Sequence, residues 1–321
     1  MVIIINPFQN PILMNIAIIS SLKDKASTNI KEHLINYYNF SKLEQEFDDN
    51  IIYYKKINNN EIKLYTIDSK LIHAEDLDKQ IEADVFIFIS KHAAKEERKS
   101  LTLHAIGNFG KAEFGGREKT LCIAPSVYLK NIFNELSKNA QDSDYEASIE
   151  ATHHGPYLEK PVLFVEIGSS EKEWIDENAG NIIAKSIINI IKKDNNIFNE
   201  KNLIINNESM KKINNDENNN YESVFVIGGS HYNHVANKVM LKTDLAVGHI
   251  CAKYNLENLD ESLIKEAMEK TIPKAKFVLL DWKGLGKEKQ RVVGILEKNN
   301  IEYKRSDKIF WLILKINHLS F

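Results

Sequence analysis

The chain of 321 residues has only two cysteines, Cys122 and Cys251, and both lie in apolar stretches (LCIAP and GHICAKY). Two cysteines cannot form a disulfide framework, and neither has a CxxC partner with which to build a cysteine zinc site. We therefore expect two buried thiols in a protein of the reducing cytoplasm.

The sequence also lacks a membrane or targeting segment and an excess of charge of one sign. The N-terminal run MVIIINPFQNPIL has no basic leader and no small-residue cleavage site, and no later apolar run is long enough to span a bilayer. The net charge of -3 gives no global attraction to nucleic acid, so an RNA ligand would need a local basic patch.

Four catalytic signatures are missing as well. The chain has no G-x-x-x-x-G-K-[ST] loop, no G-x-G-x-x-G after the first strand, no G-x-S-x-G elbow and no H-E-x-x-H. These absences argue against nucleotide hydrolysis by a P-loop, nicotinamide chemistry and a standard serine hydrolase.

Alternating strand and helix patterns predict an α/β fold. Short β-branched or aromatic runs predict strands, and nearly continuous apolar runs predict central strands covered on both faces. The predicted strands are 15–20, 51–57, 62–68, 84–90, 121–124, 162–168, 223–229 and 276–282. The neighbouring runs 51–57 and 62–68 read as a hairpin, so we expect a mixed sheet.

Helices are predicted between these strands, over 26–37, 126–139, 169–193, 260–272 and 286–300. Ser126 is a candidate N-cap for the second helix, and Ser169-Ser170 followed by acidic residues marks the start of the third. We predict an extension over residues 1–13, a single domain over 14–321 and an Asn-rich surface insertion over 206–222.

Seven of the ten histidines fall in four short clusters beside glycine. The clusters are SKHAAKEERKSLTLHAIGNFG (90–110), ATHHGP (151–156), GGSHYNHVANK (228–238) and DLAVGHI (244–250). Histidine ligates metals and moves protons near neutral pH, and α/β sites form outside the carboxyl ends of strands. The clusters therefore predict a common site.

In ATHHGP, one histidine is expected to face a pocket while the other holds the turn, because strand side chains alternate between faces. A purely structural turn is the alternative. In GGSHYNHVANK, Ser230 could cap a helix starting at His231, which would place His231 and His234 on one face. That pair would suit a metal or an anion, and the alternative is a solvated helix start.

Glu166 lies inside a run that reads as a central strand, where a carboxylate is costly unless it is paired or ligated. It is a candidate base or metal ligand, and a salt bridge to a lysine is the alternative. His249 alone is a weak signal, since a lone histidine among apolar residues is more often a satisfied core residue. His92 and His104 flank a charged run, which is either a solvated surface or a phosphate-contacting loop.

The set SKHAAKEERKSLTLHAIGNFG, ATHHGP, VEIGSSEKEW, GGSHY, VGHI and DWKG resembles the archaeal and plant type of D-aminoacyl-tRNA deacylase, from about Met14 through the last helix. The Asn-rich stretch and both termini depart from it. The resemblance implies a three-layer α/β/α sandwich with a mixed sheet, similar to purine nucleoside phosphorylases and peptidyl-tRNA hydrolases.

The resemblance further implies hydrolysis of the ester between a D-amino acid and tRNA, with mischarged glycyl-tRNA as a further substrate, by a zinc-associated monomer. Alternatives left open are another metal-assisted hydrolase of this fold (a peptidyl-tRNA hydrolase or peptidase), a nucleoside phosphorylase and a non-catalytic RNA-binding module. Either zinc activates the water, or a histidine acts as the base with N–H groups of the Gly-rich turns as the oxyanion hole.

These considerations give the following expectations. The candidate catalytic residues are His153, His154, Glu166, His231 and His249. The candidate zinc ligands are His153, His154, Glu166 and His231. The candidate substrate-binding residues are His92, His104, Asn108, Lys95, Arg98, Lys99, Gly228, Gly229 and Ser230, with Lys111 and Arg117 as further phosphate contacts.

Overall fold

A computed structural model of the protein describes residues 14–95, 98–193 and 221–311. The predicted N-terminal extension, 1–13, lies outside the described residues. So does the predicted insertion, 206–222, apart from its last two residues, the second of which, Glu222, begins strand β12.

Eight strands form a large mixed sheet in the order β10-β6-β11-β5-β1-β4-β3-β2. Their bounds are β1 Asn15–Ser21, β2 Ser41–Phe47, β3 Asn50–Ile57, β4 Asn60–Ile67, β5 Val85–Ala93, β6 Ser100–His104, β10 Glu146–Ile149 and β11 Val162–Ser169. The contiguous strands β11, β5, β1 and β4 run parallel to one another, whereas β6 is antiparallel to β11 and the β2-β3-β4 meander is antiparallel.

Helices cover one face of this sheet. They are α1 Lys25–Tyr38, α2 Ser126–Asn139 and α4 Glu177–Lys193, with the short α3 Glu171–Trp174 preceding α4. Alternate residues of β1, such as Ile16 and Ile18, pack in one core with these helices, while Ala17 and Ile19 pack in a second core with the 3₁₀ turns Leu71–His73 and Leu77–Lys79. The period of two along the strand therefore divides the core into two layers.

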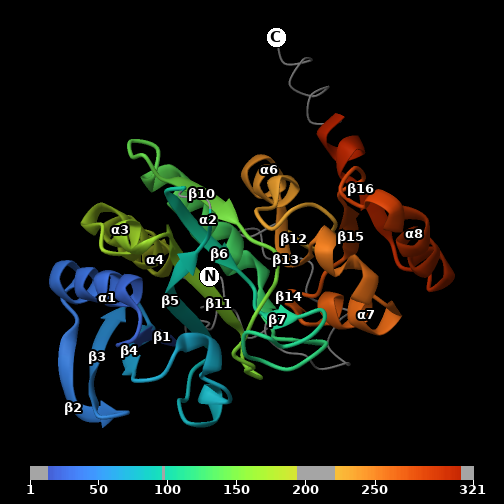
Figure 1. The fold of residues 1–321 in the computed structure, drawn as a ribbon. Coiled ribbons are helices and arrows are strands. Elements are labelled where there is room, and N and C mark those ends of the chain that lie inside the picture. The colour runs from blue at the N-terminus through green and yellow to red at the C-terminus, as the bar shows by residue number, and fades with distance from the viewer. Residues whose placement is uncertain (1–13, 96–97, 194–220, 312–321) are drawn as a thin grey trace, which may run out of the picture.

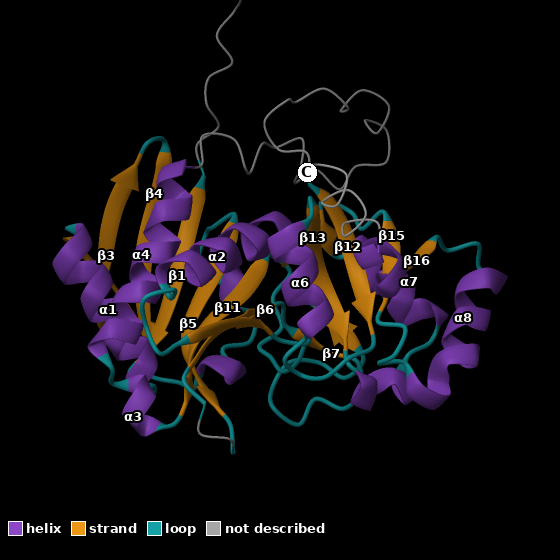
Figure 2. Ribbon diagram, turned by 90° about the horizontal axis from the view of Figure 1, so that it is seen from above, coloured by secondary structure: helices purple, strands orange, loops and turns teal. Residues whose placement is uncertain are grey.

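A second, parallel sheet has the order β13-β12-β15-β16 and lies beside the first (Figures 1 and 2). Its elements are β12 Glu222–Ile227, α6 His234–Lys242, β13 Leu245–Cys251, the 3₁₀ helix Lys253–Asn258, α7 Glu261–Glu269, β15 Phe277–Leu280, the 3₁₀ turn Gly286–Glu288, α8 Lys289–Lys298 and β16 Tyr303–Arg305. Helix α6 packs on one face, and α7 and α8 pack on the other.

Short pairings complete the fold between the sheets. Strand β7 Gly107–Asn108 pairs with β8 Thr120–Leu121, and β9 Ala124–Pro125 pairs with β14 Thr271–Ile272. The segment that continues β10 is hydrogen-bonded to the second sheet region, because Ala151 N–H donates to the His231 carbonyl and Thr152 N–H donates to the Ile250 carbonyl. This bridge brings distant histidines together.

The mixed sheet, the β3-β4 hairpin and the predicted helices are confirmed, with three local corrections. The predicted helix 169–193 is interrupted, so that α3 and α4 are separate helices. Ser126 does not cap α2, because its hydroxyl is hydrogen-bonded to Ser223 and to the Ile272 carbonyl. The predicted strand 121–124 is divided between the short strands β8 and β9.

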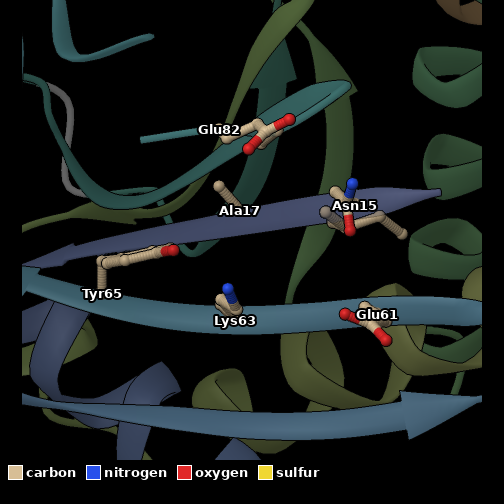
Figure 3. A pocket seen from close by; sticks show the side chains of 8 residues that line it. Asn15, Ala17, Glu61, Lys63, Tyr65 and Glu82 are labelled. Carbon is tan, nitrogen blue, oxygen red and sulfur yellow. The ribbon is translucent and has the colours of Figure 1, made fainter. Parts of the chain in front are cut away.

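No helix in the described part of the chain is both long and apolar enough to cross a membrane. A small pocket of about 10 Å³ lies along β1 and β4, where Glu61, Lys63 and Glu82 are among its lining residues (Figure 3). None of the clustered histidines lines it, so we do not assign the site to this pocket.

Candidate active site

Glu166 lies on β11, an interior strand of the large sheet, and the strand on each side of it carries a histidine. The strand period places Phe164, Glu166 and Gly168 of β11 on one face. His104 of β6 pairs with Phe164, and His92 of β5 pairs with Gly168, so both imidazoles flank Glu166. A Cβ at Gly168 would lie 3.1 Å from His92 Cδ2, so glycine leaves room for the ring.

A second buried glutamate, Glu150, faces the same group. Its Oε1 lies 3.1 Å from His92 Nδ1, and its Oε2 lies 3.1 Å from His231 Nε2 and 3.7 Å from His153 Nε2. Glu166 Oε2 lies 3.5 Å from His92 Nδ1 and 3.6 Å from His104 Nε2. These two glutamates and four histidines, together with His154 beside His153, form one centre, which we call the Glu-His centre.

Both histidines of the His153-His154 pair belong to this centre. Their rings lie 4.2 and 4.8 Å from the ring of His104, centroid to centroid. Both candidate residues therefore face the site, because His154 adopts a left-handed backbone conformation (φ 46°) that breaks the alternation of a strand.

Backbone carbonyls fix the hydrogens of three of the imidazoles. Nδ1 of His104, His153 and His154 lies 3.1, 2.8 and 2.6 Å from the carbonyls of Ala105, Ala151 and Gly155, respectively. A carbonyl only accepts, so each Nδ1 carries a hydrogen, and in the neutral ring the lone pair is on Nε2. Histidine ligands of metals are commonly held in this way.

The carboxylates and imidazoles shift each other's protonation. Burial would raise the pKa of both glutamates, but the neighbouring imidazoles lower the pKa of Glu150 and Glu166 below the usual value. Burial would lower the pKa of His92, but Glu166 and Glu150 outweigh it and raise that pKa to about 9, and they raise the pKa of His104 too. A proton on the His92 imidazole therefore offsets part of the charge of the two carboxylates.

His153 and His154 stay neutral at neutral pH. Burial, with the neighbouring imidazoles, holds the pKa of His153 well below its ordinary value. Burial and His104 lower the pKa of His154 to about 4. Their Nε2 lone pairs are therefore available as bases or ligands at neutral pH.

Three overlapping sets of side chains in the centre could hold a metal ion. In each set, one ligand atom per residue lies within 4.8 Å of the others: His104, His153 and His154; His92, Glu150 and His231; and His104, Glu150 and Glu166. Imidazole nitrogen and carboxylate oxygen are zinc ligands. Glu150 Oε1 and Oε2 and His104 Nε2 are buried atoms for which the described residues provide no hydrogen bond of good geometry, which fits a role in holding a cation.

His249 is not brought into this centre. It is fully buried, its Nε2 lies 3.0 Å from the Cys122 carbonyl, and its Nδ1 lies 3.2 Å from the Thr152 hydroxyl. Burial lowers its pKa to about 3. The structure thus gives His249 the surroundings of a neutral, hydrogen-bonded core residue.

The GGSHYNH segment differs from its predicted form. Asn233, not Ser230, caps the helix, which begins at His234, so His231 lies in the preceding loop and does not share a helical face with His234. Gly228 N–H already donates to the Cys251 carbonyl, as Gly155 N–H does to Phe114. These two N–H groups are therefore not free to form an oxyanion hole.

Three of the predicted phosphate contacts, Lys95, Arg98 and Lys99, lie in the segment between β5 and β6. Arg98 comes close to the centre, since its guanidinium carbon lies 5.8 Å from the ring of Tyr232, whose hydroxyl is 2.8 Å from His92 Nε2. Arg98 pairs with Glu146 and Lys99 with Asp144, while Lys95 is exposed.

The loop after β7 holds the other predicted contacts. Lys111 is exposed, and Arg117 pairs with Asp76 at 3.2 Å and stacks on Tyr157 at 3.8 Å. Asn108 donates its side-chain amide to the Gly115 and Arg117 carbonyls, so it holds this loop and lies outside the Glu-His centre.

Sequence reasoning missed Glu150, Tyr232 and Tyr254. Glu150 lies in the short strand-like run SIEA before the histidine pair, so the criterion that singled out Glu166, a carboxylate within a strand, would have found it. The tyrosines carry no such signal, because their contacts with His92 and His231 depend on the tertiary fold.

Comparison with known proteins places this geometry in a family. The family model described as D-aminoacyl-tRNA deacylase matches residues 79–304. A D-aminoacyl-tRNA deacylase from Thermococcus kodakarensis is 33% identical over 290 residues, which cover 88% of this chain and 96% of the relative. One from Methanosarcina mazei is 32% identical over 304 residues, which cover 92% and 93%.

A solved structure shares the fold. The crystal structure of a conserved protein of unknown function matches with a TM-score of 0.74 and 26% identity, covering 92% of this chain and 96% of the other. These similarities extend over most of this chain and over most of each relative. The chain belongs to the D-aminoacyl-tRNA deacylase family.

Proposed function

We propose that this protein hydrolyses the ester bond of D-aminoacyl-tRNA, releasing a D-amino acid and free tRNA. The observation that carries the proposal is the buried Glu-His centre in a chain of this family. Ester hydrolysis needs a base to activate water and a group that stabilises the charge on the carbonyl oxygen. The centre supplies bases and cations within a few ångströms.

Glu150 is the proposed base. Its carboxylate accepts a proton from water as the water oxygen attacks the ester carbonyl carbon, and the proton then passes to the ribose oxygen as the C–O bond breaks. The imidazoles of His92 and His231, each 3.1 Å from a different oxygen of Glu150, orient the carboxylate. Glu166 holds His92 and His104 in place from β11, the strand between them.

We propose His104, His153 and His154 as the zinc-binding set, because carbonyl partners orient their Nε2 lone pairs. This set keeps His153 and His154 from the sequence-based prediction and adds His104, while Glu166 and His231 lie beside it. When bound, zinc would lower the pKa of water and polarise the ester carbonyl.

For the remainder of the molecule, we infer the three-layer α/β/α sandwich of the phosphorylase-like fold, a monomer and a cytoplasmic location. We propose that Arg98, Lys95 and Lys99 contact tRNA phosphates beside the site, with Gly228, Gly229 and Ser230 near the aminoacyl end. Mischarged glycyl-tRNA is a further proposed substrate, since glycine has no side chain of either hand to exclude.

The test is deacylation of D-tyrosyl-tRNA against L-tyrosyl-tRNA, glycyl-tRNA and a peptidyl-tRNA. We expect release of D-tyrosine and glycine, with at least a 100-fold lower rate for the L-ester and the peptidyl ester. Equal rates for D- and L-tyrosyl-tRNA would refute the assignment, and preference for peptidyl-tRNA would favour the alternative hydrolase. Elemental analysis of protein purified without a His tag tests for zinc.

A further inference from the structure

Two histidines of the Glu-His centre are held by tyrosine hydroxyls instead of carbonyls. His92 turns Nδ1 to Glu150 and Nε2 to the Tyr232 hydroxyl, at 3.1 and 2.8 Å. His231 turns Nε2 to Glu150 and Nδ1 to the Tyr254 hydroxyl, at 3.1 and 3.0 Å. The two Tyr-His pairs thus reach opposite oxygens of one carboxylate through opposite ring nitrogens.

We propose that Tyr232 and Tyr254 are positioning residues, which orient His92 and His231 toward Glu150 during the proposed deacylation. Each imidazole has one nitrogen directed at the carboxylate, so the partner of the other nitrogen sets the rotation of the ring. Tyr232 is held in turn by an antiparallel bridge between Tyr232 and Glu150, so one backbone contact fixes the tyrosine relative to the carboxylate.

The choice of hydroxyl over carbonyl separates the five histidines into two groups. The carbonyl partners of His104, His153 and His154 require a hydrogen on Nδ1 at all times. A phenol hydroxyl donates or accepts, so His92 and His231 remain hydrogen-bonded whichever ring nitrogen carries the hydrogen. The first group presents lone pairs of fixed direction, whereas the second turns a ring N–H to Glu150 while the tyrosine hydroxyl holds the other ring nitrogen.

The test uses Tyr232→Phe and Tyr254→Phe, which remove only the hydroxyl. Tyr145→Phe is the matched control, because the Tyr145 hydroxyl also contacts an ionisable group, Asp176 at 2.9 Å, away from the centre. We expect kcat for D-tyrosyl-tRNA to fall about 10- to 100-fold in either site variant. The KM of both site variants should stay within about twofold of wild type, because the hydroxyls act through histidines and not on the tRNA. Both kcat and KM of the control Tyr145→Phe should also stay within about twofold.

Two further measurements separate a positioning role from a structural one. In ¹⁵N spectra of the imidazole side chains, Tyr232→Phe should shift the signals of His92, and Tyr254→Phe those of His231, with the signals of the carbonyl-bonded His104, His153 and His154 unchanged. The affinity for Zn²⁺ alone, from competition with a chromophoric chelator, should stay within about threefold, since neither tyrosine contacts the proposed zinc set.

Only the kcat and KM measurements rest on the proposed function, because they need hydrolysis of D-tyrosyl-tRNA. Unchanged imidazole spectra, or a kcat loss equal to that of Tyr145→Phe, would overturn the positioning role of the tyrosines. A loss of zinc affinity of 10-fold or more would overturn the division into two groups, since it would place the metal at His92 and His231. If wild-type protein released no D-tyrosine, the deacylase assignment would fail, while the spectra would still decide the positioning of the rings.

Discussion

Acid should destabilise this protein through His249, and a His249→Gln variant isolates the effect. Burial lowers the folded-state pKa of His249 to about 3, from an ordinary value of 6.5. The unfolded chain therefore binds a proton more readily than the folded one at pH values between the two. The contribution of neutral His249 is fully present above pH 6.5 and is lost progressively as the pH falls toward 3.

The size of the effect follows from that difference. At pH 5.0, about 1.5 pH units below the unfolded pKa, protonation of the unfolded chain lowers the free energy of unfolding by about 2 kcal/mol. At pH 7.5 the same linkage contributes about 0.1 kcal/mol. Glutamine keeps an amide donor for the Cys122 carbonyl but does not titrate, so His249→Gln should lose this component of the pH dependence.

The assay is urea unfolding of wild type and His249→Gln at pH 7.5, 6.5 and 5.0, with free energies from linear extrapolation. The difference between wild-type stabilities at pH 7.5 and 5.0 should exceed that of the variant by about 2 kcal/mol, since other titrating groups are common to both. Equal pH dependence in the two proteins would refute the linkage.

The same variant decides whether His249 takes part in catalysis. The sequence suggests it as a catalytic residue, whereas its two hydrogen bonds to Thr152 and Cys122 give it a structural role. We expect His249→Gln to keep kcat within about threefold of wild type at pH 7.5. A 100-fold loss with an intact fold would instead be the size of effect typical of a general acid or base.

Three further predictions concern other charged residues. In steady-state kinetics, Glu150→Gln should lower kcat for D-tyrosyl-tRNA by about 100-fold or more with little change in KM. The control is Glu135→Gln, which should leave kcat unchanged because the Glu135 carboxylate pairs with a surface lysine. Lys130→Met should lower the free energy of unfolding by about 2–4 kcal/mol in urea, because the ammonium group donates to three backbone carbonyls. Arg98→Ala should raise KM, leave kcat unchanged and reduce the salt dependence of KM by about one counterion, measured across a KCl series.

Much of the fold could be predicted from local patterns, and the exceptions have physical causes. Apolar runs identify the central strands because both their faces are buried. Strand β2 escapes this criterion, since it lies at the edge of the sheet with mostly exposed side chains and reads SKLEQEF. Strand β6 is fully buried but is only five residues long and follows a charged run, so its pattern is masked.

The composition of the site is harder to predict because it depends on strand order. Glu166, His92 and His104 come together because β11 lies between β5 and β6, although it follows both in the chain. Glu150 and His231 meet through the bridge between the two sheets. Local patterns identify candidates one by one, but contacts of this kind follow only from the arrangement of the whole sheet.

Folding and catalysis depend on the same charges in the Glu-His centre. Two buried carboxylates would be unfavourable alone, and they raise the pKa of the neighbouring His92 to about 9, so that a protonated imidazole offsets part of their charge. Replacing Glu150 removes one of the two carboxylates that face His92, so that Glu166 is the remaining one. Glu150→Gln should therefore also change stability, so its loss of turnover counts as catalytic only if urea unfolding shows a folded variant under the assay conditions.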